Sequence, residues 1–215
     1  MAAWKVKRWK LLNKKHRGFT AVEMVVVLSL IVIISAVIYT FFSTNNKMLQ
    51  GTKVRSDLQT EGEKTQNKLI YVGTNGYKLT GVKDASTDDG MSITSLASSD
   101  QAVTEFTIVI PNPSSTAEKV DLSDSSTYQT YRFKLEGSKN KVNARKLVCY
   151  GPTTSDKITL SENVEEMTIK PINATSCSLS DCKGLNVTVK LHKKKGFSDI
   201  TYPIETNMKF RNFDK

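Results

Sequence analysis

The chain has 215 residues, of which 24% are charged and 39% hydrophobic, a length that suits one globular domain with an appendage and is too short for two full domains. The net charge is +10, but seven of the 31 basic residues lie among the first 18 residues, where there is no acid; without them 24 basic residues face 21 acidic ones, a net charge of +3. Because nucleic-acid-binding proteins usually carry their excess charge in the folded body, this distribution argues against that class. With only 11 Gly, 5 Pro and no charged heptads, collagen-like and coiled-coil chains are excluded.

An almost wholly apolar segment follows the basic start. Residues 19–42 read FTAVEMVVVLSLIVIISAVIYTFF, and Glu23 is their only charged residue. A helix of about 20 such residues spans the ~30 Å hydrocarbon core of a bilayer. The preceding cluster of Lys and Arg favours a cytoplasmic N-terminus. We therefore expect a single-pass membrane protein whose remaining residues lie outside the cytoplasm.

Two ordinary explanations of this segment compete. A secretory signal peptide has a shorter apolar region and small residues at its cleavage site, whereas here Tyr39, Phe41 and Phe42 occupy that place. An uncleaved signal anchor fits the length and the charge but leaves Glu23 unexplained, unless that carboxylate lies only a turn inside the interface. A charge within a spanning helix otherwise needs a partner or a function.

The residues around this carboxylate resemble a known motif. Lys14-Lys15-His16-Arg17-Gly18, followed by Phe19-Thr20-Ala21-Val22-Glu23 and a long aliphatic run, resembles the processing signal of type IV prepilins and pseudopilins. The resemblance implies cleavage after Gly18 by a prepilin peptidase and N-methylation of the new terminus at Phe19. It also implies that Thr20 and Glu23 belong to the processing and assembly motif, with Glu23 five positions into the processed chain.

The chemistry of the motif is coherent. Gly18 has no side chain, which suits a bond that a protease must approach closely. Cleavage there leaves the apolar helix attached and creates a cationic α-amino group at Phe19, one helical turn from Glu23. In a stack of subunits the carboxylate can pair with the amino terminus of a neighbour and favour the correct axial register. The expected partners are the prepilin peptidase/N-methyltransferase, other pilin or pseudopilin subunits and the membrane assembly platform.

The helix is predicted to continue beyond the membrane. Residues 44–72 carry a weak apolar stripe at spacings of three, four or seven, formed by Val54, Leu58, Thr65 and Leu69. Many major pilins have a helix-breaking proline in the later part of the apolar segment, but there is none between Phe19 and Gly51, so we expect an unbroken helix. The turn-forming residues Gly73, Asn75 and Gly76 are predicted to end it.

The pattern then changes to the alternation of half-buried antiparallel strands. The alternating segments are residues 103–110, 128–137 and 184–191, and the inward positions are Phe106, Ile108, Ile110, Tyr131, Phe133, Leu135, Leu185, Val187, Val189 and Leu191. Asn186, Thr188 and Lys190 are predicted to point outward. Polar clusters at residues 84–90, 111–116 and 121–127 are typical of surface loops.

These features predict an α+β, pilin-like fold with four parts. They are a basic leader (1–18), a transmembrane and assembly helix (19–43), the extramembrane half of that helix (44–72) and an extracytoplasmic antiparallel β domain (73–215). The C-terminal part resembles the J-class minor pseudopilins and related minor pilins, with Leu160 and Val164, a terminal hairpin around Val187 and Ile204, and Arg211-Asn212. That resemblance implies a low-abundance subunit near a filament tip, in the membrane first and then in a surface pilus or pseudopilus.

Three cysteines are present, at positions 149, 177 and 182. An exported chain can oxidise them, and we favour a bond between Cys177 and Cys182 because the closure of a short loop costs the least entropy. Other pairings, or three free thiols, stay open.

A basic run is formed by Lys190, Lys193, Lys194 and Lys195, around His192. It is predicted to lie at a hairpin tip, where such charges are normally solvated. Contact with DNA or an anionic polymer, as in a DNA-binding pilus-tip subunit, is the alternative, but no aromatic residues interleave with the lysines to stack on bases.

No catalytic, metal or cofactor motif is found. A zinc site is not expected with only two His, and Asp84, Asp88 and Asp89 do not match a calcium loop because Asp89 stands where its Gly should be. There is no nucleophile elbow or Walker loop, so we do not expect an enzyme. The main alternative to a pilus subunit is a membrane-anchored extracellular binding protein with an uncleaved signal anchor.

Overall fold

A computed structural model describes residues 18–85, 90–115, 120–137, 145–153, 155–173 and 175–211. Apart from Gly18 the predicted leader lies outside these residues, as do Asp88, Asp89 and Asn212. The chain divides into two compact units, residues 1–46 and 47–215, and each is described by itself.

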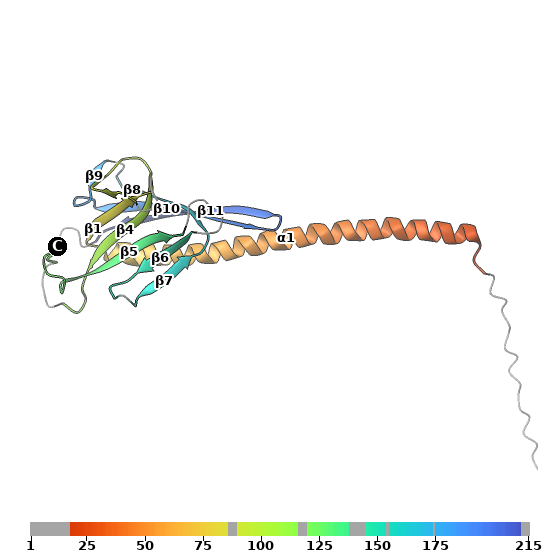
Figure 1. The fold of residues 1–215 in the computed structure, drawn as a ribbon, viewed down its shortest axis with the longest axis horizontal. Helices are drawn as coiled ribbons and strands as arrows, with labels where there is room; N and C mark the ends of the chain where they lie inside the picture. The colour runs from red at the N-terminus through yellow and green to blue at the C-terminus, as the bar shows by residue number, and fades with distance from the viewer. Residues whose placement is uncertain are drawn as a thin grey trace, which may run out of the picture. The chain divides into compact units, whose positions relative to one another are not determined.

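One long helix, one large antiparallel sheet and a small two-stranded sheet make up the fold, which confirms the α+β prediction (Figure 1). The helix α1 runs from Ala21 to Asn75. The strands that follow are β1 (Lys78–Asp84), β2 (Ser92–Ile93), β3 (Ser95–Leu96), β4 (Gln101–Pro111), β5 (Tyr128–Glu136), β6 (Lys146–Tyr150), β7 (Lys157–Ser161), β8 (Val164–Pro171), β9 (Cys177–Ser178), β10 (Gly184–Lys195) and β11 (Ser198–Lys209). Three of them, β4, β5 and β10, contain the predicted alternating segments.

The first unit contains the apolar part of α1. Every residue from Gly18 to Phe42 is exposed, and this part of the helix is long and apolar enough to cross a membrane. Polar side chains within it bond to the preceding turn of the helix: the Ser29 hydroxyl donates to the Val26 carbonyl at 2.7 Å and that of Thr40 to the Ala36 carbonyl at 2.7 Å. Such internal bonds satisfy hydroxyl groups that would have no other partner if this part of the helix were surrounded by hydrocarbon.

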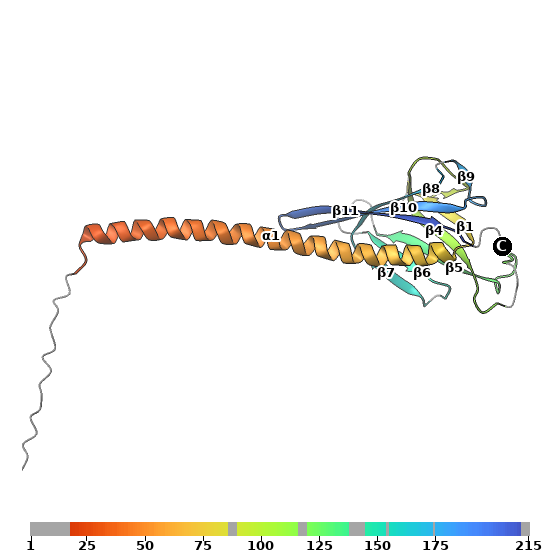
Figure 2. The same cartoon turned by 180° about the vertical axis from the view of Figure 1, so that it is seen from behind.

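The second unit is a curled sheet with the strand order β11-β10-β8-β4-β5-β6-β7, to which β1 adds on β4 and β2 on β1. All of these pairings are antiparallel. The part of α1 that belongs to this unit runs along the sheet (Figure 2). It buries Val54, Leu58, Thr65 and Leu69, so the predicted apolar stripe is confirmed as its packing face.

Most of the core lies between this stripe and the inner face of the sheet. Phe106 of β4 and Phe133 of β5 are paired across the strands and stack with their ring centroids 4.9 Å apart. The inward positions predicted on β10, among them Val187 and Val189, are buried as expected. Asn186 lies on the outer face, as predicted, between the exposed Glu205 and Asn207 of β11. It is nevertheless only 7% exposed, since these two side chains cover it and accept from its amide at 2.6 and 2.9 Å.

The predicted end of the helix needs correction. Gly73 and Asn75 do not form a turn but belong to the last turns of α1, which ends at Asn75. Gly73 is buried because Met208 of β11 packs directly on it, and a Cβ atom at this position would lie 2.5 Å from the Met208 Cβ. Glycine is therefore present here for close approach of a strand and not to break the helix.

Candidate processing and assembly site

The bond between Gly18 and Phe19 precedes the helix and is accessible. Neither residue is helical, Phe19 is 75% exposed, and among the described residues no atom beyond the immediate neighbours comes within 4 Å of a Cβ placed on Gly18. Proteases bind their substrates in extended form, so a bond in exposed, non-helical chain is chemically suited to cleavage.

Thr20 and Glu23 together form a capping box at the start of α1. The Thr20 backbone N–H donates to Glu23 Oε2 at 2.8 Å and its hydroxyl donates to the same oxygen at 3.0 Å. In return the Glu23 N–H donates to Thr20 Oγ1 at 3.2 Å. This reciprocal arrangement satisfies donors that a helix start leaves unpaired and places the carboxylate at the positive end of the helix dipole.

The sequence analysis missed this local role of Glu23, although its signal, Thr-x-x-Glu before an apolar run, is present in the sequence. The capping box adds a structural function to the one expected from pairing between subunits. Since Oε1 takes no part in these three bonds and the charge is retained, the two functions are chemically compatible.

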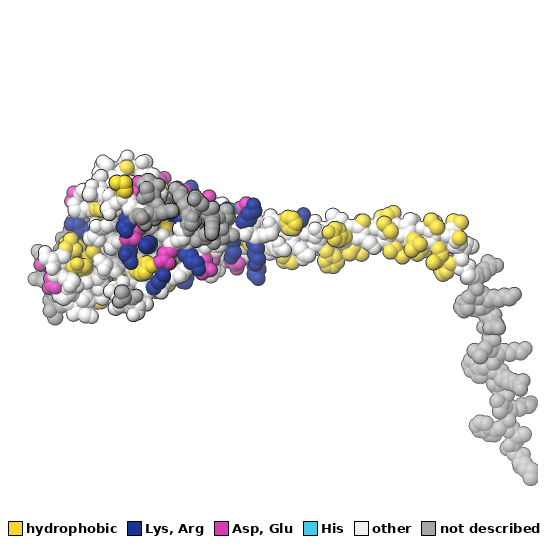
Figure 3. All heavy atoms as spheres, viewed as in Figure 1, with side chains coloured by type: hydrophobic (Ala, Val, Ile, Leu, Met, Phe, Trp, Pro, Cys, Tyr) yellow, Lys and Arg dark blue, Asp and Glu magenta, His cyan; other side chains and the backbone are white. Residues whose placement is uncertain are grey.

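The apolar side chains beyond the capping box cover the first part of the helix without a protein partner in the described chain (Figure 3). Val25, Ile33 and Val37, for example, are between 61% and 67% exposed. Such a surface is far larger than the apolar patches of soluble monomers, so it requires cover by lipid or by other protein chains.

A second feature missed by sequence reasoning fixes the other half of the helix to the sheet. Glu61 of α1 accepts from the Ser161 hydroxyl at 2.6 Å, the Glu162 N–H at 3.2 Å and the Asn163 amide at 2.7 Å. The acceptor is about 100 residues from its donors in sequence, so no local pattern points to it. It joins the helix to the turn between β7 and β8.

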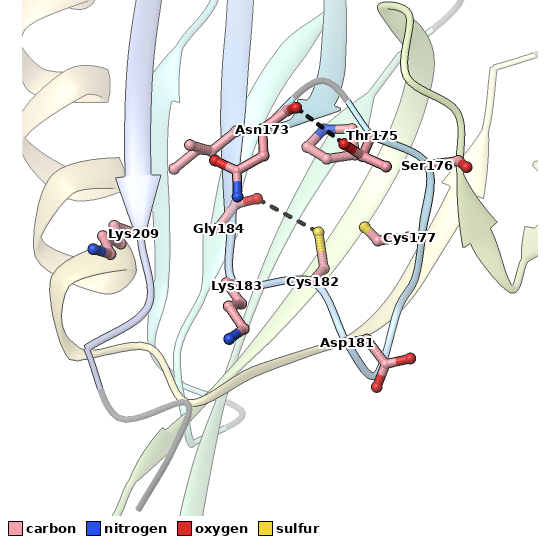
Figure 4. Close-up of a pocket in the computed structure, with 11 residues that line it drawn as sticks. Asn173, Thr175, Ser176, Cys177, Asp181, Cys182, Lys183, Gly184 and Lys209 are labelled. Carbon is pink, nitrogen blue, oxygen red and sulfur yellow. Dashed lines mark hydrogen bonds between the residues drawn. The ribbon is translucent and has the colours of Figure 1, made fainter.

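Two of the three cysteines lie side by side (Figure 4). Cys177 of β9 and Cys182, which precedes β10, are free thiols whose sulfur atoms lie next to each other, and the Cys182 thiol donates to the Gly184 carbonyl at 3.4 Å. Burial, and then the hydrogen bond with Cys177, raises the pKa of the Cys182 thiol to about 12. They line a cavity of about 420 Å³ together with Pro171, Ile172, Asp181 and Lys183.

Cys149 of β6 lies apart from this pair. It is 1% exposed in the core, and burial raises the pKa of its thiol to about 11. A buried and protonated thiol is a poor nucleophile. The predicted disulfide bond between Cys177 and Cys182 is not formed in the structure, but the positions of these two residues permit it.

The predicted basic run lies on β10, and most of its charges have partners. Lys190 pairs with Glu166 at 2.9 Å, Lys193 with Asp57 at 3.1 Å and Lys194 with Asp199 at 3.8 Å. His192 bonds Asp199 at 2.5 Å, and this hydrogen bond is the main cause that lowers the pKa of the Asp199 carboxyl. The basic residues thus form the last part of β10 and not the hairpin tip, which consists of Gly196 and Phe197.

Within the described ranges no three His, Cys, Asp or Glu side chains gather as a metal ion would require. Comparison with known proteins gives no further assignment: no protein family, no curated protein sequence and no solved structure matches this chain.

Proposed function

We propose that this chain is a structural subunit, of the minor class, of a type IV pilus, competence pilus or type II secretion pseudopilus. In this proposal it is cleaved after Gly18, N-methylated at Phe19 and assembled through its apolar helix. The observation that carries the proposal is the placement of Glu23. A carboxylate one turn into an exposed apolar helix lies directly after an accessible Gly–Phe bond and a basic leader.

The presence of Gly18 and Glu23 supports assembly in preference to simple anchoring. An anchor needs only length and hydrophobicity, and neither Gly18 nor Glu23 contributes to those. In a helical filament, by contrast, apolar helices cover one another, and a carboxylate near the start of each can pair with the α-amino group of a neighbour. Both special residues then have a function.

The proposal implies three kinds of partner. A prepilin peptidase/N-methyltransferase would process the chain at the cytoplasmic face, where the basic leader is held. Other pilin or pseudopilin subunits would contact the helix, and a membrane platform would extract it. The β domain would be extracytoplasmic, first at the membrane and then on the filament.

The test is incorporation into filaments by cells with and without an active prepilin peptidase. We expect the chain in the sheared surface fraction only when the peptidase is active, and we expect Gly18→Val to stay in the membrane with its leader. The variant Ala21→Val, which enlarges a side chain three residues further on, is the control and should be processed. A chain that never leaves the membrane fraction, although its partner subunits do, would refute the proposal.

A further inference from the structure

The turn between β10 and β11 lies against the first residues of the second unit. The Lys47 ammonium is 4.8 Å from the centroid of the Phe197 ring, and Lys193 forms its ion pair with Asp57 of the helix. A Cβ placed on Gly51 would lie 3.6 Å from Ser198 Oγ. The tip of this hairpin is therefore next to residues 47–51, where the chain enters the globular unit.

Apolar side chains are exposed at this end. Phe197 is 80% exposed, Met48 72% and Leu49 67%. Gly196, with a φ of +58°, allows a two-residue turn between Lys195 and Ser198, and Phe197 is the other residue of that turn. A large aromatic ring that is exposed in a tight turn does not serve the core.

Basic residues surround these apolar side chains. Residues 47–57 and 192–199 together carry six Lys and Arg against Asp57 and Asp199, which leaves a net charge of +4 with His192 neutral. Figure 3 shows Lys and Arg side chains, with Asp and Glu side chains among them, on one face of the second unit. We name the exposed part of this region, formed by Lys47, Met48, Leu49, Lys194, Lys195 and Phe197, the basal patch.

We propose that the basal patch docks on the anionic surface of the bilayer that holds the apolar helix. This inference rests on the proposed function, because it takes the apolar helix to span a membrane. Lys47 follows Phe42 by only five residues, which span at most about 18 Å even in a fully extended chain, so the patch begins close to the end of the apolar run. Lysines there pair with lipid phosphates, while Phe197 enters the interface as aromatic residues do.

The composition of the patch favours lipid over nucleic acid. Single-stranded nucleic acid is bound on several aromatic platforms, and the patch has one aromatic ring. Its other apolar residues, Met48 and Leu49, have no use against phosphates but gain from transfer into the interfacial region. Docking would hold the β domain close to the membrane before the subunit enters a filament, and extraction would release it.

The experiment uses the full chain with a single indole. The native residues Trp4 and Trp9 are the only tryptophans. The chain carrying Trp4→Phe, Trp9→Phe and Phe197→Trp is reconstituted into phosphatidylglycerol or phosphatidylcholine vesicles that contain a lipid spin-labelled near the headgroup. Flotation of the vesicles shows whether the chain is inserted. We expect strong quenching and a blue-shifted emission in the anionic vesicles, and weak quenching in the neutral ones.

A matched control places the indole elsewhere. Leu122 is 42% exposed and lies in the loop before β5. The first residue of β5, Tyr128, pairs with Pro111, so this loop lies at the end of the sheet where α1 ends. Leu122→Trp in the same tryptophan-free background should not be quenched. Adding Lys194→Gln and Lys195→Gln to the Phe197→Trp chain should weaken docking about 30-fold, since each basic residue near an anionic surface contributes about fivefold. The corresponding Arg variants should dock normally.

Three results would overturn the inference. One is a chain that floats with anionic vesicles but is quenched no more at position 197 than at position 122. Another is an emission shift with an oligonucleotide and none with vesicles, which would identify the patch as a nucleic-acid site. A chain that does not float at all would refute the membrane span, and with it both the docking and the proposed function.

Discussion

Thr20 and Glu23 hydrogen-bond to each other in both directions at the start of α1, with the carboxylate accepting two bonds and the Thr20 hydroxyl accepting one. Glu23 thus has a structural reason to be present within a single chain. In the proposed filament it has a second one, the pairing with a neighbour's α-amino group. A capping box needs an acceptor, whereas pairing with an ammonium group in hydrocarbon needs a charge, so the two functions can be separated.

The variant Glu23→Gln separates them. A Gln side chain retains the capping box but removes the charge. We expect Glu23→Gln and Glu23→Ala to be cleaved after Gly18 as the native chain is, and both to be reduced about tenfold or more in sheared filaments, since the loss of a pairing worth about 1.4 kcal/mol changes an equilibrium tenfold. The measurement is the ratio of filament to membrane protein by immunoblot.

Incorporation of Glu23→Gln at the native level, with a defect in Glu23→Ala alone, would contradict this account. It would assign Glu23 to helix capping. The control is Thr20→Ala, which loses the cap but retains the carboxylate. It should lower helix stability by about 1 kcal/mol, and the fraction of it that is cleaved after Gly18 should enter filaments.

The fold was predictable wherever the pattern is local. An apolar run without proline indicates α1, and the alternation of Phe106 with Ile108 or Val187 with Val189 indicates the strands β4 and β10. Short strands such as β6 and β7 lack enough residues for a period to be recognised. The order of strands depends on pairings between residues far apart in sequence, and no local pattern contains them.

The site was predictable in part for the same reason. Gly18, Phe19, Thr20 and Glu23 are neighbours in sequence, so their motif could be recognised. Glu61, by contrast, accepts hydrogen bonds from Ser161 and Asn163, which lie about 100 positions further along the chain, so no local motif contains this contact. Gly73 was assigned to a turn because glycine is common both in turns and where two elements approach closely. Only the packing of Met208 on Gly73 shows that close approach is its function here.

The close contact at Gly73 predicts the effect of an added methyl group. Gly73→Ala would bring a Cβ within 2.5 Å of the Met208 Cβ, so it should lower the free energy of unfolding by about 1–3 kcal/mol. Gly51→Ala is the matched control. The added Cβ would have its nearest contact at 3.6 Å, an ordinary van der Waals distance. Replacing a glycine inside a helix by alanine should then raise the free energy of unfolding by about 0.5–1 kcal/mol. Urea unfolding of the full chain in detergent, followed by circular dichroism, measures both; equal effects would refute the packing argument.

Removal of the Glu61 carboxylate should loosen the helix from the β7–β8 turn. Ser161 and Asn163 are 1% and 7% exposed, so their donors would be left buried without this acceptor. We expect Glu61→Ala to lower the free energy of unfolding by about 2–3 kcal/mol. Glu63→Ala removes only an exposed bond from Gln59 on the same helix and should change stability by less than about 0.5 kcal/mol. A cost for Glu61→Ala as small as this control's would show that the contact does not stabilise the protein.

The cysteine pair predicts a redox-dependent stability. In protein exported to an oxidising compartment we expect a bond between Cys177 and Cys182, with Cys149 still a thiol. A disulfide that closes a loop of six residues stabilises the folded state by about 2 kcal/mol, so a reductant should lower the free energy of unfolding of the native chain by that amount. The free energy of unfolding of the Cys177→Ser variant should not change with reductant. Peptide mapping without reduction identifies the bond, and a bond to Cys149 would contradict the structure.

The Cys149 thiol should also resist alkylation. With its pKa at about 11, only about 0.1% is thiolate at pH 8. Because this pKa is raised above the ordinary value of 9.0, the protonated thiol favours the folded state, and that contribution is lost as the pH rises from 9.0 through about 11. The pH dependence of unfolding should therefore be flatter in Cys149→Ala over this window. Identical pH profiles would show that the thiol titrates normally.

The N-terminus of the protein purified from its native membranes tests the central claim most directly. Intact mass and terminal sequencing should show a chain that begins at N-methylated Phe19, without residues 1–18. A chain that still begins at Met1 or Ala2, in cells whose prepilin peptidase processes other substrates, would contradict the account. It would leave a membrane-anchored β domain, and the assembly role of Glu23 would be lost with it.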